Sequence, residues 1–305
     1  MGNILIFGHK NPDTDAITSS IVMANLENKL GHQAEACRQG KLNKETEYVL
    51  NYAGVEAPRL IEDVEDGAEI ILVDHANPKE SVPNLENAKI LRIVDHHMVA
   101  LTTSYPLYYR AEPVGCTETI MYKLYRENNV EIDKTIALLM VSAIISDTLL
   151  FKSPTCTNED VETAKKLAEI AEIDLEKYGM DMLKAGTDLS SFSIEEILSL
   201  DAKRIDLKDK KAIIAQVNTA SIDDVLTMKA DLEAAMEKSI EDNGLDLYMF
   251  VITDIVKSTS KAIVLGNAAN VAEKAYKETI TDNVIELKGV VSRKKQIVPI
   301  MTENA

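Results

Sequence analysis

Residues 3–30 read NILIFGHKNPDTDAITSSIVMANLENKL, which has the pattern of a strand, a turn and a helix in succession. The apolar start, NILIFG, predicts a buried strand, and the stretch AITSSIVMANLENKL predicts a helix that ends at Gly31. The apolar runs EIILV at residues 69–73 and KILRIV at residues 89–94 predict further strands. Strands that alternate with helices are typical of a mainly parallel sheet with flanking crossover helices, so we predict an α/β fold.

The middle of the chain is more helical, because apolar residues recur there at three- and four-residue spacing. The predicted helices cover residues 116–128, 133–146 and 158–171. The string GTDLSSF at residues 186–192 then breaks the periodicity with small and polar residues, as interdomain linkers do. We therefore place the first domain at residues 1–187 and a hinge linker at residues 188–192.

A second, smaller α/β domain is predicted at residues 193–305. Its predicted strands are AIIAQV at residues 212–217, LYMFVITDI at 247–255 and KAIVLG at 261–266. One long helix is predicted at residues 221–244, with Ser221 as its N-cap and Gly244 at its end.

The composition excludes several classes of protein. The chain of 305 residues, 46% of them hydrophobic, can bury a sizeable core. It has no apolar run of the roughly 18 residues that span a membrane, and its start does not resemble a signal peptide. Because neither feature is present, we expect a cytoplasmic protein. The net charge of −17 disfavours binding to nucleic acid or to a membrane. Cys37, Cys116 and Cys156 have no CxxC spacing and are expected to be reduced.

Side chains that commonly bind metals follow each of the three predicted strands of the first domain. They are His9, Asp13 and Asp15 after the first strand, Asp74 and His75 after the second, and Asp95, His96 and His97 after the third. A fourth place is Asp147, which lies in the apolar tract VSAIISDTLLF. Because the carboxyl ends of parallel strands meet at one edge of a sheet, these side chains can converge there.

Each of these residues also has an ordinary structural interpretation. Asp13 or Asp15 can be a helix N-cap, and Asp74 can be an exposed turn residue. Asp147 can be a buried cap or an ion-pair partner, because a buried carboxylate needs a compensating group. The string DHH at residues 95–97 is the most specific of the four places, since packing hardly explains two adjacent histidines behind an aspartate at a strand end.

Together these residues form a mixed carboxylate and imidazole set without a thiolate. Such a set suits manganese, cobalt or magnesium better than a structural zinc ion, and its size suggests two ions. Two ions about 3.5–4 Å apart can lower the pKa of a shared water and neutralise charge on a phosphoryl group. The predicted chemistry is therefore phosphoryl transfer to water.

A basic cluster, SRKKQ at residues 292–296, interrupts two apolar runs near the C-terminus. Its ordinary interpretation is a solvated basic edge. Combined with a metal centre, it supplies the cations that an anionic substrate needs. Arg293 can hold two phosphate oxygens at once, and Lys294 can act as a point charge.

The strings HKNPDTD at residues 9–15, DHH at 95–97 and SRKKQ at 292–296 resemble the family II inorganic pyrophosphatases of the DHH phosphoesterase superfamily. The resemblance covers essentially the whole chain. It implies an N-terminal DHH domain, a C-terminal DHHA2-type domain, and hydrolysis of diphosphate to two phosphates. It further implies two Mn²⁺ or Co²⁺ ions per subunit, Mg²⁺ bound with the substrate, and a homodimer.

The resemblance also implies a role for each matched residue. One metal ion would be bound by His9, Asp13 and Asp74, and the other by Asp15, Asp74, His96 and Asp147. Asp95 would orient an imidazole ring. The substrate would be bound by His97, Lys203, Arg293 and Lys294.

The mechanism that the family implies is in-line attack by a metal-bridged hydroxide after the two domains close over pyrophosphate. Asp74, as the bridging ligand, and His97, which would help to protonate the leaving phosphate, are the expected catalytic residues.

Three other functions remain open at this point. An exopolyphosphatase shares much of the same C-terminal chemistry, and only its preference for long chains separates it. A nucleotide or oligonucleotide phosphoesterase is disfavoured because the glycine-rich C-terminal motif is absent and the surface is acidic. A regulatory metal-binding module without catalysis would not need Arg293 and Lys294.

Overall fold

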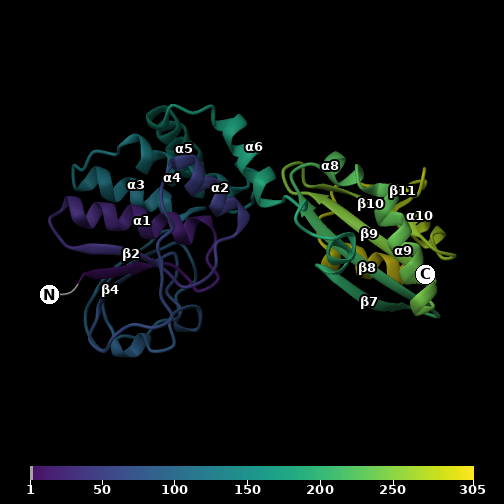
Figure 1. The fold of residues 1–305 in the computed structure, drawn as a ribbon, viewed down its shortest axis with the longest axis horizontal. Helices are drawn as coiled ribbons and strands as arrows, with labels where there is room; N and C mark the ends of the chain where they lie inside the picture. The colour runs from purple at the N-terminus through teal and green to yellow at the C-terminus, as the bar shows by residue number, and fades with distance from the viewer. Residues whose placement is uncertain (1–2) are drawn as a thin grey trace. The chain divides into compact units, whose positions relative to one another are not determined.

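The computed structural model describes residues 3–305, which form two compact units that adjoin in the chain between Gly186 and Thr187 (Figure 1). The boundary lies beside the segment expected to be a linker. The role of residues 188–192 as a hinge stays a prediction.

The first unit contains, among residues 3–186, a six-stranded sheet in the order β3-β2-β1-β4-β5-β6. Its strands are β1 (Ile4–Phe7), β2 (Ala34–Arg38), β3 (Arg59–Leu60), β4 (Glu69–Val73), β5 (Lys89–Asp95) and β6 (Tyr108–Ala111). Every neighbouring pair is parallel, which confirms the predicted fold class. β1 lies between β2 and β4, so the strand order reverses there, and such a switch point is where α/β sheets bind ligands.

Helices cover one face of this sheet (Figure 1). They are α1 (Thr14–Lys29), α2 (Lys44–Ala53), α3 (Thr117–Glu127), α4 (Lys134–Thr148), α5 (Asn158–Ala171) and α6 (Leu175–Gly186). α1 begins at its N-cap Asp13 and ends just before Gly31, close to the predicted bounds. α4 is buried over most of its length because it packs against both α1 and α5.

The opposite face is covered by the two irregular segments that join β3 to β4 and β4 to β5. The second segment contains the short 3-10 helices η1 (Pro78–Glu80) and η2 (Leu85–Asn87). Ile61, Val64, Val82 and Leu85 pack there against buried residues of β1, β4 and β5. Burial on both faces explains why the central strands are almost uniformly apolar.

The second unit is built, within residues 187–305, around a five-stranded sheet in the order β11-β10-β9-β8-β7. Its strands are β7 (Ala202–Leu207), β8 (Lys210–Thr219), β9 (Leu247–Asp254), β10 (Thr259–Leu265) and β11 (Val284–Leu287). β8 and β9 are parallel and the other pairs are antiparallel. All eight residues of the central strand β9 are buried, because helices cover both of its faces.

The helices of this unit are α7 (Ile194–Ser199), α8 (Ile222–Leu226), α9 (Lys229–Asn243), α10 (Asn270–Tyr276) and α11 (Val298–Asn304), with a π-helical turn, η3 (Arg293–Ile297). The prediction of a single helix at residues 221–244 is wrong in one respect, since the structure has two helices there, α8 and α9. Its predicted ends are correct: Ser221 caps α8, and Gly244 ends α9 in the left-handed conformation. No glycine or proline marks the break, so the sequence does not indicate it.

None of the helices within residues 3–305 has the length and apolar composition that crossing a bilayer requires.

Candidate metal centre

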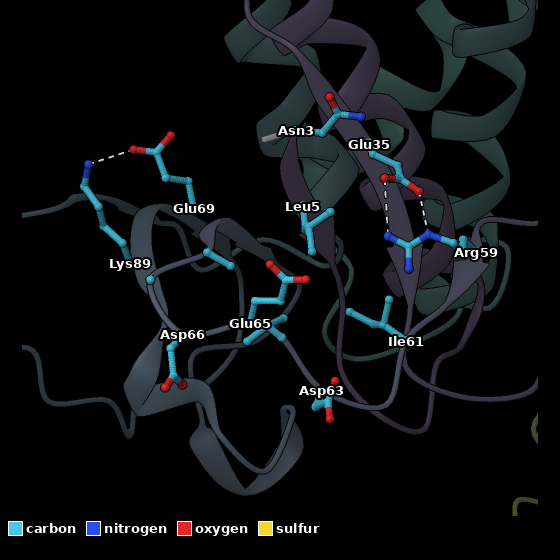
Figure 2. Close-up of a pocket in the computed structure, with 13 residues that line it drawn as sticks. Asn3, Leu5, Glu35, Arg59, Ile61, Asp63, Glu65, Asp66, Glu69 and Lys89 are labelled. Atoms are coloured by element: carbon cyan, nitrogen blue, oxygen red, sulfur yellow. Dashed lines mark hydrogen bonds and ion pairs between the residues drawn. The ribbon is translucent and has the colours of Figure 1, made fainter. Parts of the chain in front are cut away.

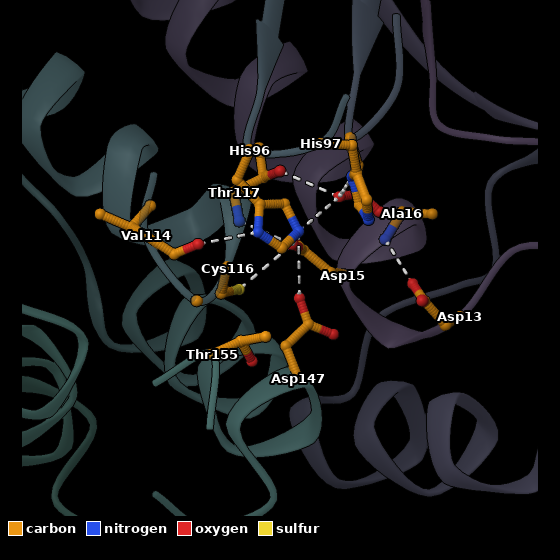
Figure 3. Close-up of polar contacts among 12 residues, drawn as sticks. Asp13, Asp15, Ala16, His96, His97, Val114, Cys116, Thr117, Asp147 and Thr155 are labelled. Carbon is orange, nitrogen blue, oxygen red and sulfur yellow. Dashed lines mark hydrogen bonds and ion pairs between the residues drawn. The ribbon is translucent and has the colours of Figure 1, made fainter. Parts of the chain in front are cut away.

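The predicted ligand side chains of the first unit gather at the carboxyl end of its parallel sheet. His9 follows β1, Asp74 follows β4, His96 and His97 follow β5, Asp13 and Asp15 lie at the start of α1, and Asp147 lies in the last turn of α4. Figure 3 shows Asp15, His96 and Asp147 pointing toward one another. Because parallel strands all end at one edge, His9, Asp74 and His96 meet there, and the end of α4 brings Asp147 to the same place.

One group of possible ligands consists of His9, Asp13 and Asp74. The Nε2 atom of His9 lies 3.6 Å from Asp13 Oδ2 and 3.4 Å from Asp74 Oδ2. Asp13 is also the N-cap of α1, because its Oδ1 accepts a 3.0 Å hydrogen bond from the Ala16 backbone N–H. The capping and ligand interpretations of Asp13 are therefore compatible, since they use different oxygens.

A second group consists of Asp15, His96 and Asp147. His96 Nε2 lies 3.6 Å from Asp147 Oδ2 and 3.9 Å from Asp15 Oδ2. A small divalent ion held at about 2.1 Å by each ligand separates its ligand atoms by about 3–4 Å, so these spacings suit one. The Nδ1 atom of His96 contacts the Val114 carbonyl at 3.0 Å, which turns Nε2 toward the carboxylates.

Asp74 lies between the two groups and is almost completely buried. Its Oδ2 faces His9, whereas its Oδ1 lies 3.4 Å from His96 Nε2. The backbone of Asp74 has φ = 58°, a strained conformation that aspartate adopts more readily than most residues and that aims the carboxylate at the centre. Asp74 Oδ2 and His96 Nε2 are buried without a hydrogen bond among the described residues, so a bound cation would satisfy both.

His75, which follows Asp74 directly, is not part of the centre. Its Nδ1 contacts the Val73 carbonyl at 2.9 Å and its Nε2 contacts Ser81 Oγ at 3.1 Å. The ring is buried beside Phe7, and this burial lowers its pKa. Its position next to an aspartate at a strand end is therefore explained by packing.

The acidic residues of the centre lie close enough to raise one another's pKa values. Burial and the charge of Asp74 raise the pKa of Asp15 to about 6. Burial and the charge of Asp15 raise the pKa of Asp147 well above its ordinary value. Burial also opposes ionisation of Asp74, but the close imidazoles of His9 and His96 outweigh it and lower its pKa. Divalent cations would relieve this repulsion, so the centre fits the predicted metals.

His97 differs from His96 because its side chain is half exposed. Its Nδ1 lies 3.0 Å from Asp95 Oδ1, and that oxygen also accepts a hydrogen bond from the His97 backbone N–H. The hydrogen bond with Asp95 raises the pKa of His97 and leaves Nε2 as the nitrogen for other contacts. Asp95 thus contacts an imidazole, as the resemblance implies.

Thr117 is a supporting residue that the sequence did not reveal. Its backbone N–H donates to Asp15 Oδ2 at 2.7 Å, and its hydroxyl donates to Asp74 Oδ1 at 2.9 Å. Cys116 Sγ adds a 3.2 Å contact to Asp15 Oδ2, and Ser19 donates to Asp15 Oδ1 at 2.7 Å. The sequence predicts a helix at residues 116–128, but it does not indicate which acidic residues would accept hydrogen bonds from the start of that helix.

The predicted phosphate-binding residues lie in the second unit. Arg293 and Lys294 line a cavity of about 280 Å³ together with Asp201, Gln216 and Ser292. Arg293 Nη2 lies 2.8 Å from Asp201 Oδ1, and its Nη1 donates to the Asp201 carbonyl. Lys203 is exposed on β7 and is not among the residues that line this cavity.

A larger cavity, of about 840 Å³, lies at the amino ends of the strands in the first unit (Figure 2). Its two cations are paired, Arg59 with Glu35 and Lys89 with Glu69. The remaining charged residues that line it are the acids Asp63, Glu65 and Asp66. An excess of negative charge does not suit a pyrophosphate, so this cavity is no alternative substrate site.

Comparisons with known proteins identify the family of the chain. The family model "DHH family, N-terminal domain" matches residues 3–144, and the model "DHHA2 domain" matches residues 180–304. The chain is 54% identical over 305 residues to the manganese-dependent inorganic pyrophosphatase of Bacillus subtilis (strain 168), covering 99% of each chain.

Solved structures show the same relationship. A Methanococcus jannaschii protein assigned to the family II inorganic pyrophosphatases has a TM-score of 0.63 and 43% identity, with 98% of each chain covered. An exopolyphosphatase-related protein from Bacteroides fragilis has a TM-score of 0.51 but 14% identity, covers 99% of this chain and 91% of that one, and shares the fold alone. The chain therefore belongs to the family of manganese-dependent, or family II, inorganic pyrophosphatases.

Proposed function

We propose that this chain is a manganese-dependent inorganic pyrophosphatase that hydrolyses diphosphate to two phosphates. The observation that carries the proposal is the position of Asp74, whose two oxygens face two different groups of imidazole and carboxylate ligands. Full-length similarity to a manganese-dependent inorganic pyrophosphatase supports the substrate.

The two groups divide the proposed ligands between two ions. His9, Asp13 and Asp74 would hold one ion, and Asp15, Asp74, His96 and Asp147 would hold the other. Nitrogen and oxygen ligands without a thiolate suit Mn²⁺, and they suit Co²⁺ as well. When bound, two such ions would lower the pKa of a shared water for in-line attack and would neutralise charge on the phosphoryl group.

The protein's own residues would position the substrate and move a proton. We propose that His97, held by Asp95 through Nδ1, contacts the pyrophosphate and protonates the leaving phosphate. Its raised pKa favours the protonated ring that such a role needs. The buried hydrogen bonds from Thr117 hold Asp15 and Asp74 in place for the metal ions.

The cations of the second unit would bind the phosphates. We propose that Lys203, Arg293 and Lys294 neutralise a substrate that arrives with Mg²⁺ and carries several negative charges. The proposed metal ligands and these cations belong to different units. We propose, as the family resemblance implies, that the units close over the substrate so that both sets act on it. A homodimer is also proposed, on the family resemblance alone, and the cytoplasm is proposed as its location.

The test is phosphate release by metal-stripped protein with manganese, cobalt, zinc or magnesium added back separately. Pyrophosphate and tripolyphosphate are compared as substrates at equal phosphoanhydride concentration. We expect rapid hydrolysis that manganese or cobalt activates and that is largely confined to pyrophosphate. A preference for tripolyphosphate would favour an exopolyphosphatase, and the absence of hydrolysis of both would favour a phosphodiesterase or a binding module.

A further inference from the structure

Glu45 joins two helices that carry proposed metal ligands. It lies in the first turn of α2 and is partly buried. Its Oε1 accepts a 2.8 Å hydrogen bond from the hydroxyl of Thr14, and the same oxygen accepts a hydrogen bond from the hydroxyl of Ser146. One carboxylate oxygen thus receives donors from α1 and from α4.

The two donors lie directly beside proposed ligands. Thr14 stands between Asp13 and Asp15 at the start of α1, and Ser146 precedes Asp147 in the last turn of α4. The distance between the two helix ends therefore depends on a shared acceptor. A second contact from the same turn of α2, 3.1 Å between the hydroxyls of Thr14 and Thr46, strengthens the attachment of α1.

The end of α6 packs against the other side of Glu45. A Cβ atom added to Gly186 would lie 2.9 Å from Glu45 Cβ and 3.1 Å from Glu45 Oε2. Gly186 is not among the positive-φ glycines, so its backbone does not need glycine for conformational reasons. Glycine is needed here for space, because Glu45 lies too close to the position that a methyl group would take.

We infer that Glu45 is a positioning residue that sets the separation of Asp15 and Asp147, and that Gly186 is required to keep Glu45 in place. The inference rests on the proposed function, because it concerns the ligands proposed for one manganese ion. Its physical basis is that small displacements of ligand-bearing helix ends alter metal affinity. Residues that orient ligands typically change affinity about 10–100-fold when they are lost.

The first test compares Glu45→Leu with Glu45→Gln in metal-stripped protein. Free Mn²⁺ is measured by its solution EPR signal during titration, and the melting temperature of the metal-free protein is measured in parallel. Glutamine keeps an oxygen that can accept both hydroxyls, whereas leucine keeps only the approximate volume. We expect leucine to weaken Mn²⁺ binding about 10–100-fold and glutamine to stay within about threefold of the original protein.

Two further variants test the same contact from its neighbours. Ser146→Ala removes one donor and favours the helix, so it should fold even if Glu45→Leu does not, and it should weaken Mn²⁺ binding measurably. Gly186→Ala should also weaken Mn²⁺ binding, although alanine normally stabilises a helix. Lys177→Ala, on an exposed position of α6, is the matched control and should have no effect. Because Gly186 and Ser146 act through Glu45, their effects should not add to those of Glu45→Leu.

The outcomes separate the inference from the proposed function. If the original protein binds no Mn²⁺, the proposed function fails. If it binds Mn²⁺ and Ser146→Ala and Gly186→Ala bind it equally well, the inference about Glu45 is wrong. Equal losses in Glu45→Gln and Glu45→Leu would also overturn it, because the charge of Glu45, and not its acceptor geometry, would then be responsible.

Discussion

Binding of Mn²⁺ to the metal-free protein should displace protons from two histidines. Burial disfavours the charged form of His9, but the close carboxylates of Asp13 and Asp74 outweigh it and raise its pKa to about 10. For His96, burial is likewise outweighed by Asp74 and Asp15, and the pKa is raised to about 9. Both rings are therefore protonated near neutral pH, whereas an imidazole must be neutral to bind a metal ion.

The size of the effect follows from these two shifts. Since both pKa values are raised, protons compete with Mn²⁺ at every pH below about 9. Each competing proton changes the apparent association constant about tenfold per pH unit, so two protons change it about a hundredfold. The apparent affinity should rise with pH at this slope and level off above about pH 10, where both imidazoles are neutral. Asp147, with its raised pKa, should add to the release.

The assay is calorimetric titration of metal-stripped protein with Mn²⁺ near pH 7.5, repeated in buffers with different ionisation enthalpies. The slope of the observed enthalpy against the ionisation enthalpy gives the number of protons released. We expect about two or more, and about one fewer in a His9→Gln variant. A slope of zero, together with an affinity that does not depend on pH, would refute the reasoning.

Three further predictions concern single substitutions. Thr117→Val should lower Mn²⁺ affinity about 10–100-fold because it removes the hydroxyl that donates a hydrogen bond to Asp74, whereas Thr117→Ser should keep the affinity. Equal losses of affinity in the two variants, measured by calorimetry, would contradict this. Arg293→Ala should lower kcat/KM for pyrophosphate and leave Mn²⁺ affinity nearly unchanged, and loss of metal binding would show that the two units do not divide these tasks. Lys277→Gly should raise the free energy of unfolding in urea by about 1 kcal/mol, because Lys277 follows α10 in the left-handed conformation (φ = 55°), which is strained for a residue with a side chain. An equal gain in Lys277→Ala would count against backbone strain as the cause.

The central strands of the first unit were predictable because they are buried on both faces. EIILV and the apolar part of NILIFG are nearly continuous apolar runs, and both form strands within or close to the predicted bounds. β2 has the sequence AEACR and β6 has the sequence YYRA, and neither has a recognisable pattern. β6 lies at an edge of the sheet, where less burial is required, so the composition does not identify it as a strand.

The predicted ligands converge because their types and positions follow simple rules. Aspartate and histidine at the ends of parallel strands must lie at one edge of the sheet. The roles of His9, Asp15 and Asp147 as ligands stay predictions that the metal titrations test. The supporting contacts could not be predicted, because Thr117 and Glu45 act through hydrogen bonds to residues distant in sequence.

The fold class, the family and the residue types of the candidate centre could be predicted from the sequence, since apolar periodicity and residue type are local properties. The three-dimensional arrangement was needed to show that Asp74 turns one oxygen toward each group of ligands while His75 turns into the core. The structure also shows that the end of α6, at Gly186, packs against Glu45. Such arrangements depend on one backbone dihedral angle or on packing between distant segments, and neither leaves a pattern in a single sequence.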